Sequence, residues 1–183
     1  MRKFRSISRV ILLTGLLLLD VSCSGFWKQQ LPLDTLTNDA RGMSNGDLAG
    51  PGLQRVETAR LDVPDQDKNL EVVLYKPTSP QTPAPAIVFL PGRMATDDQY
   101  ESYARALASR GFFVAVRSWY SLFRSDLELA HDAKVIADWL IQDQGVDSRK
   151  IGIAGHSMGG KDAVLAAAKY VGFASVVAHR SGR

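Results

Sequence analysis

The sequence of 183 residues lacks what several protein classes require. Its one cysteine, Cys23, cannot form an intramolecular disulfide. It shows no internal repeat, no cluster of metal-ligating side chains and no phosphate-binding glycine loop, so we expect no cofactor. The apolar run from Val10 to Leu19 has ten residues, whereas a membrane-spanning helix needs about 20.

An excess of positive charge is also missing once the N-terminus is set aside. The formal net charge of +3 arises from 22 basic and 19 acidic residues. Four of the basic residues and one acidic residue lie within residues 1–22, which leaves 18 of each sign in the rest of the chain. We therefore expect no binding to nucleic acid. A hydrophobic content of 45% is typical of a globular domain.

Residues 1–22 have the pattern of a signal peptide, with a basic start followed by the apolar run. Ser22 and Cys23 then resemble a bacterial lipoprotein cleavage site, which makes Cys23 the candidate for lipidation and for a membrane anchor. Asp20 departs from that pattern, so ordinary export with cleavage nearby is the alternative. We expect an exported protein, either lipid-anchored in the bacterial cell envelope or secreted. The composition of residues 23–52 predicts a tether or irregular arm.

From residue 53 to residue 183, expected strands alternate with helices, which predicts an α/β domain. Its sheet should be mostly parallel, with helices on both faces. The first two strands are expected to form an antiparallel pair, and the proline-rich stretch after them cannot belong to a central strand. Ser125 and Glu128 predict a capping box that opens a helix ending before Gly145. The strands are expected at 54–61, 70–75, 85–90, 112–116, 151–154 and 173–178, the proline-rich loop at 76–85, and another helix along 100–108 before Gly111.

The most informative motif is Gly155-His156-Ser157-Met158-Gly159, which lies between a short apolar run and an alanine-rich helical pattern. A serine nucleophile on a sharp strand-to-helix turn needs small neighbours, and Gly155 and Gly159 supply them. The motif predicts that Ser157 stands on this turn with its hydroxyl exposed above the sheet. A residue one position before such a serine points away from it, so His156 is interpreted as a packing residue and not as the base.

A second candidate element lies upstream, where an apolar strand ends in Pro91-Gly92-Arg93. The loop after such a strand can supply one oxyanion N–H, and the residue after the nucleophile can supply the other. The expected donors are the backbone amides of Arg93 and Met158. Taken alone, the Pro-Gly pair equally indicates a plain strand end, and the serine motif downstream favours the functional interpretation.

Residues from about 53 to 178 resemble the N-terminal half of an α/β-hydrolase. The resemblance is greatest to the group of dienelactone hydrolases, cutinase-like polyester hydrolases and chlorophyllases. It is carried by Ile87 to Arg93, by the block DSRKIGIA at 147–154, and by the serine motif with Gly160. It implies a partial α/β-hydrolase fold and a serine hydrolase of small-molecule or polymeric carboxylic esters. By that resemblance Ser157 is the nucleophile, and Met158 and Arg93 flank the oxyanion hole.

The sequence departs from this family after the serine. In the family an acid and then a histidine follow on later strands. Here no Asp or Glu occurs after Asp162, which falls within the expected helix, and His179 is the one histidine after Ser157. Nothing is expected to orient the ring of His179 as a base. We therefore expect a C-terminally truncated chain that lacks the last strands and helices and has impaired activity. The alternative is a non-catalytic, exported or membrane-tethered remnant of such an enzyme.

Overall fold

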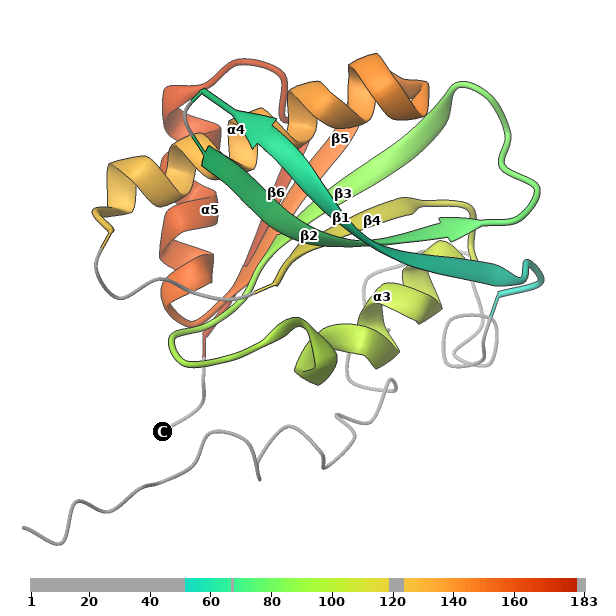
Figure 1. Ribbon diagram of the computed structural model, residues 1–183, viewed down its shortest axis with the longest axis horizontal. Helices are drawn as coiled ribbons and strands as arrows, with labels where there is room; N and C mark the ends of the chain where they lie inside the picture. The colour runs from blue at the N-terminus through green and yellow to red at the C-terminus, as the bar shows by residue number, and fades with distance from the viewer. Residues whose placement is uncertain (1–51, 67, 119–123, 181–183) are drawn as a thin grey trace, which may run out of the picture.

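A computed structural model describes residues 52–66, 68–118 and 124–180, which form a six-stranded sheet with helices on both faces (Figure 1). The strands lie side by side in the order β1-β2-β4-β3-β5-β6. Their bounds are Val56–Asp65 (β1), Lys68–Pro77 (β2), Ala84–Leu90 (β3), Phe113–Arg117 (β4), Val146–His156 (β5) and Ser175–His179 (β6). The α-helices are Glu101–Ala108 (α3), Asp126–Gln144 (α4) and Met158–Lys169 (α5), and a short 3-10 helix, η2, spans Asp97–Tyr100.

Four neighbouring strands of the sheet, β4, β3, β5 and β6, run parallel. β1 and β2 pair antiparallel along their whole length, from Val56 opposite Pro77 to Asp65 opposite Lys68. β2 joins the parallel part through an antiparallel pairing with β4. The predicted mostly parallel sheet, opened by an antiparallel pair, is confirmed.

The hydrophobic core has two layers, one on each face of the sheet. Helices α4 and α5 cover one face and α3 covers the other (Figure 1). All five residues of β4 are buried, because side chains on both of its faces lie under helices. β6, by contrast, is an edge strand whose five residues are all exposed. The larger core cluster, beneath α4 and α5, includes Leu70, Val88, Ile136, Leu140, Ile151 and Ile153, and the smaller one, beneath α3, includes Val73, Tyr100, Ala108, Val114 and Val116.

The helix boundaries follow the local signals in the sequence. At the start of α4 the Ser125 hydroxyl accepts a hydrogen bond from the Glu128 amide, and the Glu128 carboxylate accepts one from the Ser125 amide. Gly145 ends the same helix with φ 68°, a left-handed conformation that glycine adopts without steric cost. The predicted capping box and helix end are confirmed.

The expectation for the proline-rich segment was partly wrong. β2 continues to Pro77, and β3 begins at Ala84, so that Pro85 lies inside a central strand. The register between β3 and β5 shifts between Ala84 and Ala86. Pro85 therefore stands at an irregularity of the pairing, one of the few places where a strand tolerates the missing N–H.

The predicted signal peptide at 1–22, the lipidation candidate Cys23 and the arm up to residue 51 lie outside the described residues. Among the residues that are described, no helix is long and apolar enough to span a membrane.

Candidate active site

Ser157 occupies the turn between β5 and α5. β5 ends at His156 and α5 begins at Met158, so Ser157 is the N-cap residue of the helix, with φ 55° and ψ −116°. A positive φ is sterically unfavourable for a residue with a Cβ and is found where surrounding contacts enforce it. One such contact is the hydrogen bond from the Ser157 amide to the His179 carbonyl on β6, at 2.7 Å. The predicted strand, sharp turn and helix are confirmed.

The two glycines of the motif allow backbone segments to pass at very short range. A Cβ at Gly155 would lie 2.2 Å from the Gly159 carbonyl oxygen. A Cβ at Gly159 would lie 2.3 Å from the carbonyl oxygen of Pro91. Real Cβ atoms do not approach backbone atoms this closely, so both positions require glycine. The second contact also brings the start of α5 against the loop that follows β3.

That loop carries Arg93, the other candidate oxyanion residue. β3 and β5 are parallel neighbours with Leu90 opposite Gly155, so the loop after β3 and the Ser157 turn leave the sheet at the same edge. The loop is a tight turn in which the Ala95 amide donates to the Gly92 carbonyl at 3.0 Å and Met94 has φ 57°. The structure thus brings together the chain segments of Arg93, Ser157 and Met158.

His156 is buried, with 4% of its surface exposed. Its Nδ1 lies 2.9 Å from the Tyr100 hydroxyl oxygen, and its ring centroid is 5.7 Å from that of His179. Burial, and then the neighbouring His179, lowers the pKa of His156 to about 4, so the ring is neutral at pH 7. The ring is directed to Tyr100, in agreement with its interpretation as a packing residue.

Three further side chains that could take part in acid–base chemistry are His179, Asp162 and His131, and they occupy different places relative to the Ser157 turn. His179 is exposed at the last position of β6, opposite His156 in the register. Asp162 is buried inside α5. His131 lies on α4 close to Tyr170, beyond the far end of α5 from Ser157, and a helix of 12 residues is about 18 Å long.

The fold is similar to that of a candidate dienelactone hydrolase from Klebsiella pneumoniae subsp. pneumoniae, with a TM-score of 0.62 over 70% of this chain. The chain has a partial α/β-hydrolase fold. The two sequences are 17% identical, and this chain covers 62% of the length of the Klebsiella protein. No protein-family model matches the sequence, and no curated protein matches it.

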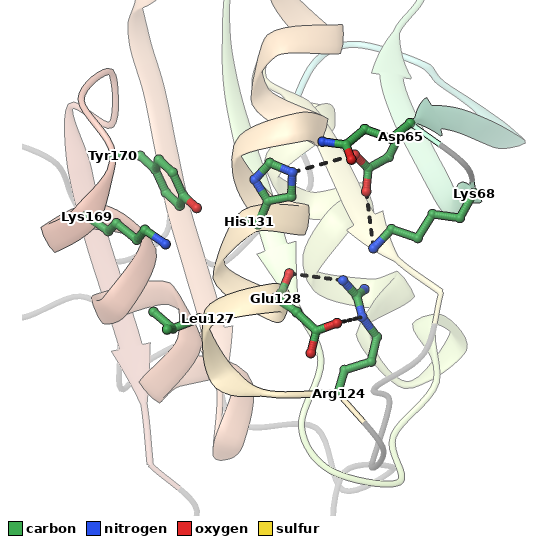
Figure 2. A pocket seen from close by; sticks show the side chains of 9 residues that line it. Asp65, Lys68, Arg124, Leu127, Glu128, His131, Lys169 and Tyr170 are labelled. Carbon is green, nitrogen blue, oxygen red and sulfur yellow. Dashed lines mark hydrogen bonds and ion pairs between the residues drawn. The ribbon is translucent and has the colours of Figure 1, made fainter.

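A hollow of about 460 Å³ lies elsewhere on this α/β-hydrolase fold, between the β1–β2 hairpin, α4 and the C-terminal end of α5 (Figure 2). Its polar side chains are paired with one another: Lys68 with Asp65 at 3.1 Å, and Arg124 with Glu128 at 3.8 Å. The His131 side chain is 40% exposed, and its Nε2 lies 3.5 Å from the Asp65 carboxylate. No local pattern in the sequence indicates this hollow, because its residues come from β1, β2, α4 and α5, and the two strands lie far from the two helices along the chain. The lining residues are Asp65, Gln66, Lys68, Arg124, Leu127, Glu128, His131, Lys169 and Tyr170.

A buried charge cluster adjoins the hollow. Asp132 on α4 is fully buried, and its carboxylate forms ion pairs with Arg117 at 2.9 Å, Lys68 at 3.3 Å and Arg124. Desolvation lowers the pKa of Arg117, although its contact with Asp132 favours the charged form. These ion pairs connect α4 to β2 and β4, which is a structural role. Among the described residues, no group of three or more His, Cys, Asp or Glu side chains is placed to bind a metal ion.

Proposed function

We propose that the chain is a serine hydrolase of carboxylic esters in which Ser157 is the nucleophile. The backbone of Ser157 carries this proposal, because φ 55° on a non-glycine residue between a strand and a helix is the conformation that exposes a nucleophile above the sheet. Such a conformation costs roughly 1–3 kcal/mol and is concentrated at functional sites. Ser157 itself is partly exposed, as an attacking hydroxyl must be.

In the proposed reaction the Ser157 hydroxyl oxygen attacks the ester carbonyl carbon, and the hydroxyl proton leaves to a base. Negative charge then develops on the carbonyl oxygen. The backbone amides of Met158 and Arg93 are the proposed donors to it, and the N-terminal end of α5 adds a favourable dipole. The alcohol leaves with a proton, and water releases the acid from the acyl-serine.

The proton of the Ser157 hydroxyl needs an acceptor, and His179 is the proposed base. Of the three histidines, His131 lies beyond the far end of α5, and the buried ring of His156 is held by Tyr100. His179, on the strand next to Ser157, is the one exposed at the same sheet edge. We propose that turnover is impaired, since loss of the histidine or serine of a well-studied triad lowers kcat by about 10⁶.

A fluorophosphonate probe tests the proposal directly. The folded chain should become labelled, Ser157→Ala should abolish labelling, and Ser148→Ala, at an exposed serine toward the other end of β5, should not change it. Hydrolysis of p-nitrophenyl butyrate should be slow and should depend on Ser157. His179→Asn asks whether that histidine serves as the base. Absence of labelling in folded protein would refute the enzyme proposal and leave a non-catalytic role.

We also propose, from the sequence of the N-terminus, that residues 1–22 direct export and that Cys23 carries lipid. Bacterial expression should place the protein in the membrane fraction with labelled palmitate incorporated, and Cys23→Ser should remove the label. Full-length protein retained in the cytoplasm would contradict this proposal.

A further inference from the structure

Tyr100 is a fully enclosed tyrosine beside the candidate active site. It is the last residue of η2, is 2% exposed, and packs on Phe89 of β3 with ring centroids 4.8 Å apart. Its hydroxyl oxygen accepts a hydrogen bond from the Gly92 amide at 2.8 Å and lies 2.9 Å from Nδ1 of His156. One buried hydroxyl therefore contacts both segments of the site.

The chemistry of these partners fixes the direction of the hydrogen bond from Gly92. A backbone N–H can only donate, so the bond from Gly92 occupies a lone pair of the Tyr100 oxygen. A neutral histidine has one acceptor nitrogen, and the Tyr100 hydroxyl has one hydrogen to donate. If the hydroxyl hydrogen points to Nδ1 of His156, the proton of the neutral ring lies on Nε2; if the proton lies on Nδ1, it donates to the second lone pair of the Tyr100 oxygen. Either direction keeps the contact.

The two contacted residues immediately precede the two parts of the candidate site. Gly92 precedes Arg93, the proposed oxyanion donor, and His156 precedes Ser157. They are packed so tightly that a Cβ at Gly92 would lie 2.8 Å from Nδ1 of His156. Any movement of the loop relative to the turn must therefore stretch or break a contact to Tyr100.

We propose that Tyr100 is a positioning residue for the proposed ester hydrolysis, and that its hydroxyl fixes the Gly92–Arg93 loop relative to the Ser157 turn. The role depends on the function proposed above. Tyr100 affects the stabilisation of the oxyanion through the position of the Arg93 amide. A shift of that amide by a fraction of an ångström weakens a hydrogen bond that contributes most in the transition state.

Tyr100→Phe is the decisive variant, because it keeps the ring against Phe89 and removes one oxygen atom. Tyr103→Phe is its matched control: the Tyr103 hydroxyl is also buried, and it has no hydrogen-bond partner among the described residues. Removing a whole oxyanion donor lowers kcat about 10²- to 10³-fold. We expect Tyr100→Phe to lower kcat for p-nitrophenyl butyrate, and the rate of fluorophosphonate labelling, about 10- to 100-fold. KM should stay within about twofold, and Tyr103→Phe should match wild type.

Nitrogen-15 NMR of the histidine rings gives a readout that does not require turnover. Wild-type His156 should be neutral at pH 7, and its Nδ1 chemical shift should move in Tyr100→Phe but not in Tyr103→Phe. An Nδ1 shift that is the same in wild type and in Tyr100→Phe would refute the contact on which the positioning role rests.

The two proposals fail in different ways. If wild type is labelled and folded Tyr100→Phe is labelled at the same rate, the positioning role is wrong and the enzyme proposal stands. If folded wild type is not labelled at all, the enzyme proposal fails and the positioning role falls with it.

Discussion

Acid should destabilise this fold through one histidine. His156 is buried with 4% of its surface exposed, and burial lowers its pKa from 6.5 to about 4. Between these pH values the unfolded chain binds a proton at this position and the folded chain does not. Protonation therefore favours the unfolded state, and the free energy of unfolding must fall as the pH falls from about 6.5 toward 4.

The size of this effect follows from the two pKa values. Each pKa unit corresponds to about 1.4 kcal/mol, so the complete penalty is about 3–4 kcal/mol and is reached only below pH 4, where both states are protonated. At pH 4.5 the linkage relation gives about 2–3 kcal/mol. For a domain of this size, that loss should lower Tm by roughly 10 °C relative to pH 7. No change should come from His156 above pH 7, where both states are neutral.

Urea unfolding from pH 7.5 to pH 4.5 measures the slope, and His156→Asn removes the titrating group while keeping an acceptor for Tyr100. The variant should be less stable at neutral pH, because it leaves a small cavity, but it should lose about 2–3 kcal/mol less than wild type on acidification. His131→Asn is the control, since the side chain of His131 is 40% exposed. Equal slopes for wild type and His156→Asn would show that the reasoning is wrong.

Two other substitutions test the packing that holds the site. Asp132→Asn should lower the free energy of unfolding by about 3–5 kcal/mol in urea, because it leaves the buried charge of Arg117 without its counter-ion. Gly159→Ala should destabilise by about 1–3 kcal/mol and slow fluorophosphonate labelling, because the new Cβ would lie 2.3 Å from the Pro91 carbonyl oxygen. Gly145→Ala, which meets no atom within 4 Å, should cost about 1–2 kcal/mol through its φ of 68° alone and leave labelling unchanged.

Local features of this chain could be predicted because each depends on a few adjacent residues. The turn at Ser157 needs small residues two positions before and after it, and the caps of α4 need Ser125 and Gly145. Pro85 was expected both at the end of the proline-rich loop and at the start of the next strand, and it lies in β3 because of a register shift between two strands that is not visible in the sequence of one of them. Asp132 gave no signal for the same reason: its partners lie on β2, on β4 and before α4.

The contact between Tyr100 and His156 shows where sequence reasoning stops and what the fold adds. The predicted helix along 100–108 includes Tyr100 but gives no partner for its hydroxyl, and Tyr100 and His156 are 56 positions apart. Their meeting requires β3 to lie beside β5 and η2 to return over the ends of both strands. The strained turn at Ser157 is thus enclosed on several sides: by β6 through the His179 carbonyl, by the β3 loop against Gly159, and by Tyr100 through His156. A backbone conformation that is unfavourable by itself persists only where surrounding contacts enforce it. The glycine motif therefore marks the position of the strained residue, and residues distant in sequence maintain its conformation.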